Sequence, residues 1–168
     1  MTLALHTFVS PCGPLVLAAH DDQLVQLHLP ESADAPPVGT ERLTPILKRT
    51  AKQLAEYFAG KRTSFELDLA AVGTAFQRRV WDELVTIPFG TTTSYGAIAQ
   101  AIGRPAASRA VGAANGRNPI AIIVPCHRVI GSTGALTGFG GGLPMKQFLL
   151  AHERAHHPTA QLGLPLAT

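Results

Sequence analysis

The stretch SYGAIAQAIGRPAASRAVGAANG, from Ser94 to Gly116, has the pattern of two short helices joined by a tight turn. Ser94 suits the N-cap of the first helix and Gly103 its end, while Asn115 and Gly116 suit the end of the second helix. Two short helices joined in this way are typical of a helix-turn-helix. The pattern also fits an ordinary tight pair of helices in a core.

The second helix of this pair carries one arginine among small residues. Arg109 is followed closely by Ala110, Gly112 and Ala113. Small side chains let a helix lie close against another backbone, and a long arginine side chain reaches past the contact surface that they form. This helix is therefore a candidate for contact with a partner.

Directly after the helix pair, the stretch IVPCHRVIG places Cys126 beside His127 and Arg128. The thiolate is the reactive form of cysteine, and a neighbouring base or cation favours it. Adjacent residues of an extended segment point to opposite faces, so a water bridge between Cys126 and His127 is an alternative to a direct bond. A buried, inert cysteine beside a surface histidine is a further alternative.

A nucleophile and its base need a third group that orients the base. The part of the chain after residue 73 has three acids, Asp82, Glu83 and Glu153. Asp82 and Glu83 lie on an early predicted helix, whereas Glu153 lies at the end of the predicted helix LPMKQFLLAHE that follows the cysteine. Glu153 is therefore the preferred orienting residue, on position alone.

The glycine-rich stretch TGFGGGLP, residues 137–144, comes between the cysteine and that last helix. It has neither the register of a dinucleotide-binding loop nor the Lys-Ser/Thr of a P-loop. A tight or flexible pocket loop is the better interpretation, with Phe139 as a stacking wall.

The N-terminal part predicts strands at 6–10, 13–20, 24–29 and 64–69, because β-rich runs there are separated by turn residues. A proline-rich polar connection follows the third strand, and a helix begins after Thr44 and ends at Gly60. The fold class is therefore α+β, with a small N-terminal domain of an antiparallel sheet and a helix.

The C-terminal part is predicted to be mostly helical and begins with a helix, AFQRRVWDELVTI, that Thr74 caps. The predicted domains are residues 1–73, a structural α/β domain, and 74–155, which carries the helix pair and the cysteine stretch. Residues 156–168 show no periodicity and are expected to form a mobile tail.

Composition indicates a globular chain, since 46% of the 168 residues are hydrophobic and 15% are charged. Residues 1–73 hold six Lys and Arg against eight Asp and Glu, whereas residues 74–168 hold eight against three. This asymmetry fits either a polyanion partner for the basic part or a solvated basic face.

The two cysteines, Cys12 and Cys126, belong to no CxxC motif, so neither a zinc site nor another metal is expected. No run approaches the length of a membrane span, and the N-terminus lacks the pattern of a signal peptide. The expected location is the cytoplasm, with the cysteines reduced.

Taken together, four motifs in order resemble the DNA alkyltransferases that repair O6-alkylguanine. PCHRV is similar to their active-site motif, residues 91–119 to their helix-turn-helix and asparagine hinge, and residues 138–153 to their substrate loop and closing helix. The similarity runs without a gap from about Phe76 to Glu153. Residues 10–29 more weakly resemble the family's N-terminal domain, which is ribonuclease H-like.

The resemblance implies that Cys126 takes the alkyl group, that His127 acts as general base through a water, and that Glu153 polarises His127. Asn118 matches the hinge asparagine that stabilises the turn carrying the cysteine. The reaction would move a methyl or small alkyl group from O6 of guanine, and also from O4 of thymine, onto the protein after the nucleotide is flipped out of the duplex. The thioether is stable, so each molecule would act once.

The resemblance also implies roles in binding DNA and the base. Tyr95 matches a tyrosine that donates to guanine N3, Arg109 an arginine that fills the gap in the duplex, and Val129 a residue whose carbonyl receives the guanine amino group. The expected DNA-binding residues are Tyr95, Arg104, Arg109, Ala110, Gly112, Ala113, Arg117 and Arg128. The expected pocket residues are Tyr95, Pro125, Val129, Phe139, Gly140 and Gly141.

Phe139 and Gly140 stand where many relatives have a tyrosine and a serine, so a backbone N–H is expected to take over the role of the serine hydroxyl. The expected partner is duplex DNA carrying alkylated bases, without a membrane or a cofactor, and the protein is expected to be a monomer that clusters along DNA. Two alternatives are a sensor that binds alkylated DNA without reacting and an unrelated cysteine hydrolase. Cysteine at position 126 argues against the sensor, because alkyltransferase-like sensors replace it, and the basic helix-turn-helix argues against the hydrolase.

Overall fold

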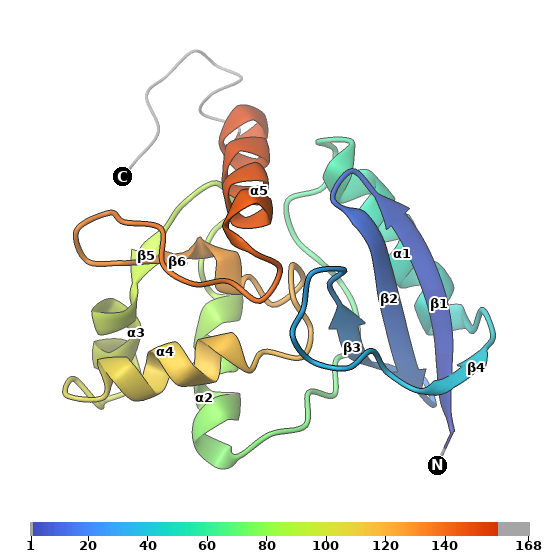
Figure 1. The fold of residues 1–168 in the computed structure, drawn as a ribbon, viewed down its shortest axis with the longest axis horizontal. Helices are drawn as coiled ribbons and strands as arrows, with labels where there is room; N and C mark the ends of the chain where they lie inside the picture. Colours follow the sequence, from blue (N-terminus) through green and yellow to red (C-terminus); the bar gives the residue numbers. More distant parts are fainter. Residues whose placement is uncertain (1, 158–168) are drawn as a thin grey trace. The chain divides into compact units, whose positions relative to one another are not determined.

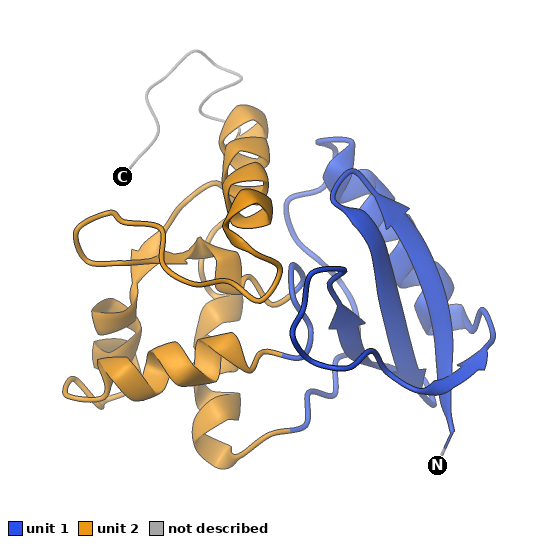
Figure 2. Cartoon of the chain, viewed as in Figure 1, with its two compact units in different colours: residues 1–72, 119–123 blue, residues 73–118, 124–168 orange. Residues whose placement is uncertain are grey.

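The computed structural model describes residues 2–157, which fall into two compact units. The first unit comprises residues 1–72 and 119–123, and the second comprises 73–118 and 124–168 (Figure 2). The short segment 119–123 belongs to the first unit because the backbone N–H of Leu27 donates to the carbonyl of Pro119 at 2.9 Å and Leu27 forms a β-bridge with Ile120. The chain therefore crosses between the units three times.

The first unit is built on a four-stranded sheet in the order β3-β2-β1-β4 (Figure 1). Its strands are β1 (Leu3–Ser10), β2 (Gly13–His20), β3 (Gln23–His28) and β4 (Gly39–Glu41). The first three strands form an antiparallel meander, and Gly13 takes a φ of +101° at the first turn. β4 pairs with β1 in parallel, so the sheet is mixed rather than purely antiparallel.

Two segments of this unit differ from the pattern that the sequence predicts. β4 lies within the proline-rich connection, where no strand is predicted. Residues 64–69 form no regular strand and make a single bridge, from Leu69 to Leu24. The Gln53 side chain bonds both the N–H and the C=O of Glu66, at 2.9 and 3.1 Å, so these backbone groups pair with a helix rather than a strand.

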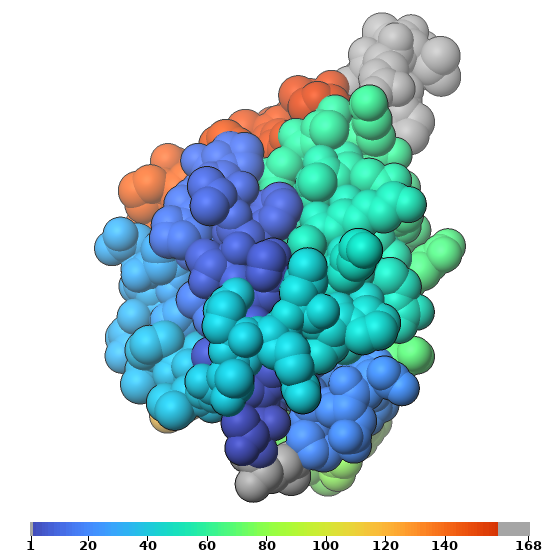
Figure 3. All heavy atoms as spheres, turned by 90° about the vertical axis from the view of Figure 1, so that its right-hand side faces the viewer, coloured from blue at the N-terminus to red at the C-terminus, as the bar shows by residue number. Residues whose placement is uncertain are grey.

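The helix α1 (Pro45–Phe58) packs on this sheet through its apolar side. Ile46, Leu47, Leu54 and Tyr57 are fully buried, and the Phe58 ring stacks on Phe8 of β1 with 6.3 Å between ring centres. Figure 3 shows the surface of this unit, with β1 in dark blue next to the cyan chain of β4 and the start of α1. Thr44 occupies the N-cap position, but its side chain makes no capping hydrogen bond.

The second unit is mostly helical, with α2 (Ala75–Val85), α3 (Tyr95–Ala101), α4 (Ser108–Gly116) and α5 (Leu143–His156). Thr74 and Gln77 form a capping box at the start of α2. The indole N–H of Trp81 donates to the carbonyl of Ala114 at 2.8 Å and ties α2 to α4. The short strands β5 (Thr93–Ser94) and β6 (Val129–Ile130) pair in parallel and join the segment before α3 to the segment after the cysteine.

The α+β class predicted from the sequence is confirmed, and so is the helix-turn-helix arrangement of α3 and α4, which lie side by side (Figure 1). The last helix continues past Glu153 to His156, so the first residue of the predicted tail is helical. Residues 158–168 of that tail lie outside the described residues. Within residues 2–157, none of the helices is long and apolar enough to cross a membrane.

Candidate active site

Cys126 begins a short 3₁₀ turn, η1 (Cys126–Arg128), that follows Pro125. Its backbone N–H donates to the carbonyl of Val124 at 2.8 Å, and the Asn118 side chain donates to the same carbonyl at 2.8 Å. A weaker contact of 3.4 Å joins the Asn115 amide to the carbonyl of Cys126. These bonds hold the cysteine in a defined position, and Cys126 is only 6% exposed.

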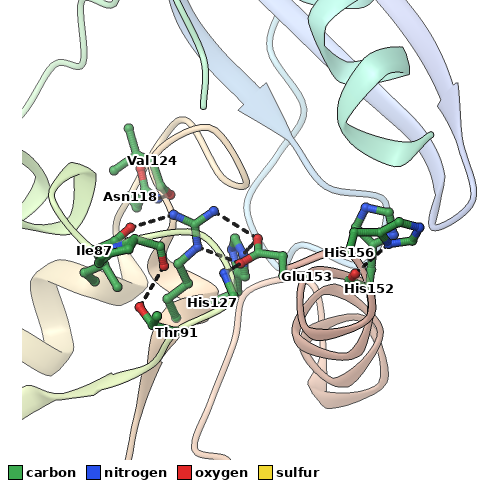
Figure 4. Close-up of polar contacts among 11 residues, drawn as sticks. Ile87, Thr91, Asn118, Val124, His127, His152, Glu153 and His156 are labelled. Carbon is green, nitrogen blue, oxygen red and sulfur yellow. Dashed lines mark hydrogen bonds and ion pairs between the residues drawn. The ribbon is translucent and has the colours of Figure 1, made fainter. Parts of the chain in front are cut away.

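The turn also directs the next two side chains toward a single carboxylate. Nε2 of His127 lies 2.6 Å from one oxygen of Glu153, and Nε of Arg128 lies 2.7 Å from the other (Figure 4). A second arginine nitrogen and the backbone N–H of Gly90 also bond this carboxylate, at 3.1 and 3.2 Å. Glu153, His127 and Arg128 thus form a buried hydrogen-bonded cluster, with His127 and Glu153 fully inaccessible.

Burial, hydrogen bonds and neighbouring charges together set the protonation states of Glu153 and His127. Burial alone acts to raise the pKa of Glu153, but His127 and Arg128 outweigh it and hold the pKa far below its usual range. Burial lowers the pKa of His127 despite the attraction of Glu153, so the imidazole is neutral at pH 7. Because Nε2 faces a carboxylate, it carries the ring proton, and Nδ1 keeps a lone pair that meets no hydrogen-bond partner among residues 2–157.

The Cys126 thiol lies in an environment that opposes its ionisation. Burial raises its pKa, while a hydrogen bond from Asn118 and the positive charge of Lys146 act in the opposite direction. The sequence indicates activation by Arg128, but the guanidinium is turned to Glu153 and to the carbonyl of Ile87, at 2.7 Å. The thiol therefore needs a base to accept its proton at neutral pH.

Lys146 is the site residue that sequence reasoning misses. Its side chain is fully buried, and Nζ donates to the carbonyls of Val129 at 2.7 Å and Thr137 at 3.0 Å. Burial lowers its pKa, and the nearby Cys126 acts to raise it. The available signal is its helical spacing from Leu149 and Glu153, which places a lysine on the buried side of α5.

The structure places most of the predicted DNA-binding residues on the helix-turn-helix surface. Those that are exposed are Arg104, Arg109, Ala110, Ala113 and Arg117, and those that are half-buried are Tyr95 and Gly112. A β-carbon at position 112 would lie 3.8 Å from the Tyr95 ring, so α3 and α4 pack closely there.

Arg128 does not belong to this surface, and its assignment as a DNA-binding residue is corrected. The residue is only 6% exposed, and its guanidinium is paired with Glu153 and stacked 5.7 Å from the centre of the Phe89 ring. All three guanidinium nitrogens already bond Glu153 or the carbonyl of Ile87 inside the unit, so this buried group is not presented to a phosphate at the surface.

The predicted pocket residues lie at the start of α3, on either side of the turn η1 and in the loop before α5. Pro125, Val129 and Gly141 are buried, Phe139 is half-buried and Gly140 is exposed. The Tyr95 hydroxyl lies 2.8 Å from Oγ1 of Thr137, at the start of the glycine-rich loop, residues 137–142. Among the described residues, no three His, Cys, Asp or Glu side chains gather in a way that would hold a metal ion.

Both units match known protein families. Residues 75–155 match the 6-O-methylguanine DNA methyltransferase, DNA binding domain, and residues 3–71 match the ribonuclease-like domain of the same enzymes. The methylated-DNA–protein-cysteine methyltransferase of Mycolicibacterium paratuberculosis is 52% identical over 155 residues, which cover 92% of this chain and 94% of the relative. That of Methanosarcina acetivorans is 48% identical over 149 residues, with 87% and 95% covered.

The fold also agrees with that of a solved relative. The crystal structure of Mycobacterium tuberculosis OGT in complex with DNA superposes with a TM-score of 0.86 at 48% identity and covers 94% of this chain and 97% of that one. The helix-turn-helix and the buried turn that carries Cys126 therefore define a protein of the DNA alkyltransferase class. The chain belongs to the 6-O-methylguanine DNA methyltransferase family.

Proposed function

We propose that this protein repairs DNA directly, by moving a methyl or small alkyl group from O6 of guanine to Sγ of Cys126. One observation carries the assignment of residues. Nε2 of His127, the neighbour of Cys126, donates a hydrogen bond to Glu153 at 2.6 Å, and Nδ1 has no hydrogen-bond partner among residues 2–157. A histidine held in this tautomer is a base ready to accept the thiol proton.

In the reaction, the thiol proton passes through a water to Nδ1 of His127, and the thiolate attacks the alkyl carbon in line. The S–C bond forms as the C–O6 bond breaks, and its electron pair leaves on O6. The proton that His127 has taken up returns through water to the leaving base and restores neutral guanine, and Tyr95 assists by donating a hydrogen bond to N3. Lys146 stabilises the thiolate, since its charge lowers the pKa of Cys126 against the effect of burial.

The alkyl carbon lies inside the base stack, so the nucleotide has to leave the duplex before the reaction, at a cost of a few kcal/mol. Arg109 is exposed on α4, which supports a role in filling the gap, and the small exposed residues around it would allow close approach to the duplex. In the pocket, the carbonyls of Cys126 and Val129 are the acceptors for the guanine amino group. Asn118 keeps the turn in place through its bond to Val124.

An alkyl thioether is stable to water, so each molecule reacts once. O4-alkylthymine is a second substrate, and the protein acts on duplex DNA as a monomer, with clustering along the duplex. The cysteines Cys12 and Cys126 are both free, which fits a reducing compartment such as the cytoplasm.

Intact-mass measurement tests the activity. The protein is incubated with a duplex that carries one O6-methylguanine, and the mass of each protein molecule is recorded with time. We expect a single added methyl group in amounts that match the duplex consumed. Unchanged protein mass with bound, unrepaired duplex would instead identify a lesion sensor, and repair of many duplexes by each molecule would identify a turnover enzyme.

A further inference from the structure

Thr137 is held from two sides by elements that are distant in sequence. Its hydroxyl lies 2.8 Å from the Tyr95 hydroxyl at the start of α3, and its carbonyl accepts a hydrogen bond from Lys146 of α5 at 3.0 Å. The same ammonium group bonds the carbonyl of Val129 at 2.7 Å, so the first residue of the glycine-rich loop is fixed to the segment that follows Cys126. The backbone at Thr137 is thus anchored independently of its side chain.

In a hydroxyl pair at this distance either oxygen can be the donor, so the direction of the bond depends on what else the two groups contact. The phenol of Tyr95 has one proton to donate and lone pairs to accept. When the Thr137 hydroxyl donates to the phenol oxygen, the phenol proton is left for another acceptor. Because Lys146 fixes the backbone of Thr137, the threonine hydroxyl is already in place to impose this orientation.

The Tyr95–Thr137 bond is exposed to solvent in the free protein, where water competes for both hydroxyls. Its net contribution to folding stability is therefore small. A flipped nucleotide in the pocket displaces this water, and the lower local dielectric strengthens the remaining hydrogen bonds. The bond thus contributes more to the complex with the base than to the free protein.

We propose that Thr137 is a positioning residue that orients the Tyr95 hydroxyl for donation to the flipped base. The inference rests on the proposed function, in which Tyr95 contacts that base. It adds Thr137 to the residues that determine the transfer rate, beside Cys126, His127 and Glu153. It also gives the first residue of the glycine-rich loop a role in recognising the base.

The test is a double-mutant cycle on the single-turnover rate with methylated duplex. Thr137→Val removes the hydroxyl and keeps the carbonyl that Lys146 binds, and Tyr95→Phe removes the other hydroxyl. Thr137→Ser restores a hydroxyl, and Thr133→Val makes the same change at an exposed position outside the glycine-rich loop. Thermal unfolding of each variant accompanies the rates.

We expect Thr137→Val to slow transfer about fivefold, the value of one neutral hydrogen bond, without lowering the unfolding temperature. Thr137→Ser and Thr133→Val stay within about twofold of the wild-type rate. In the Tyr95→Phe background, Thr137→Val has no further effect, because the partner hydroxyl is already gone.

Three results would overturn the inference: a wild-type rate in Thr137→Val, the same fivefold loss in the Tyr95→Phe background, or a loss that Thr137→Ser shares. In each case the wild type and Thr133→Val still transfer methyl groups, so the proposed function stands. An absence of transfer in the wild type would instead refute the proposed function.

Discussion

At the residue scale, the chemistry depends on a cysteine that burial makes a weak acid. The adjacent Arg128 does little to favour the thiolate of Cys126, because its guanidinium is bonded to Glu153 and to the carbonyl of Ile87. The proposed proton acceptor is His127, whose Nε2 faces Glu153 and whose Nδ1 is left as the basic nitrogen. Activation of the nucleophile therefore passes through Glu153, although Glu153 makes no contact with the alkyl group in this scheme.

Glu153→Gln tests this dependence. The change removes the charge that fixes the His127 tautomer, so we expect transfer at pH 7 to slow by roughly tenfold or more. Raising the pH toward the pKa of the thiol should recover part of the rate, because solvent then ionises Cys126 directly. The measurement is the single-turnover rate against pH for the variant and the wild type, and identical profiles would remove Glu153 from the mechanism.

The same substitution also leaves Arg128 buried without its partner charge. We expect the free energy of unfolding to fall by about 3 kcal/mol, as for other buried ion pairs that lose one member. Rates are therefore compared at a temperature where near-ultraviolet circular dichroism shows both proteins folded. A matched control is Asp82→Asn, which neutralises an exposed acid on α2 and is expected to change stability by less than about 0.5 kcal/mol.

Residue types in the sequence identify Cys126 and His127 as candidates, and position alone selects Glu153, which the structure places 2.6 Å from His127. The roles of Arg128 and Lys146 are not visible in the sequence. A lysine or arginine is expected on the surface by default, and only the three-dimensional structure shows Lys146 bonded to the carbonyls of Val129 and Thr137.

At the element scale, the helix-turn-helix places Arg109 on an exposed part of α4, while Val111 and Ala114 of the same helix are buried. The hydrogen bonds that hold the cysteine turn come from Asn115 and Asn118 and do not involve Arg109. The proposed role of Arg109 is to stabilise the extruded nucleotide in the duplex, not to assist the bond-making step.

Arg109→Ala separates these two steps. We expect transfer from methylated duplex to slow by tenfold or more, since a few kcal/mol of unstacking is no longer offset, while transfer from free O6-alkylguanine changes less than about twofold. Both rates are measured under single-turnover conditions. Equal losses on duplex and free base would show that Arg109 acts on the chemistry or on the fold.

The turn after α2 is constrained at Gly90. Gly90 has a φ of +77°, its N–H bonds Glu153, and a β-carbon there would collide with the His157 ring. Gly90→Ala is expected to cost at least 1–2 kcal/mol of unfolding free energy, about the cost of the left-handed backbone alone. Urea titration checks it, with Gly103→Ala as a control that meets the same backbone cost without a neighbour within 4 Å. Equal losses at the two positions would show that the contact with His157 is unimportant.

Element prediction succeeds where local signals and tertiary contacts agree. Thr74 caps α2 and Ser94 caps α3 as their residue types predict. The strand predicted at 64–69 does not form, because the Gln53 side chain bonds the backbone N–H and C=O of Glu66. β4 is not predicted, because it pairs with β1, a strand that lies far away in the sequence. Contacts between segments far apart in the chain decided both cases.

At the scale of the whole molecule, the buried cluster links stability to pH. The folded pKa of Glu153 lies below its unfolded value of about 4.3, so its contribution is present above about pH 4.3 and is lost as the pH falls toward the folded pKa. The pKa of His127 is also lowered, so the unfolded chain takes up a proton first below about pH 6.5 and stability falls there too.

We therefore expect the free energy of unfolding to decrease as pH is lowered from about 7, with a steeper decrease below about pH 4.3. Glu153→Gln should flatten the lower part of this curve, because the group that titrates is gone. Denaturant titrations at a series of pH values measure both curves. Parallel curves for the two proteins below about pH 4.3 would contradict a lowered pKa of Glu153 in the folded protein.

Cys126 is the proposed acceptor of the alkyl group, and a peptide map of the protein after reaction with a duplex carrying isotopically labelled O6-methylguanine tests this most directly. Cys12, the other free cysteine, is the internal control. We predict the label on the peptide that contains Cys126, unchanged in Cys12→Ser and absent in Cys126→Ser. Label on Cys12, or labelled protein in the Cys126→Ser variant, would contradict the account.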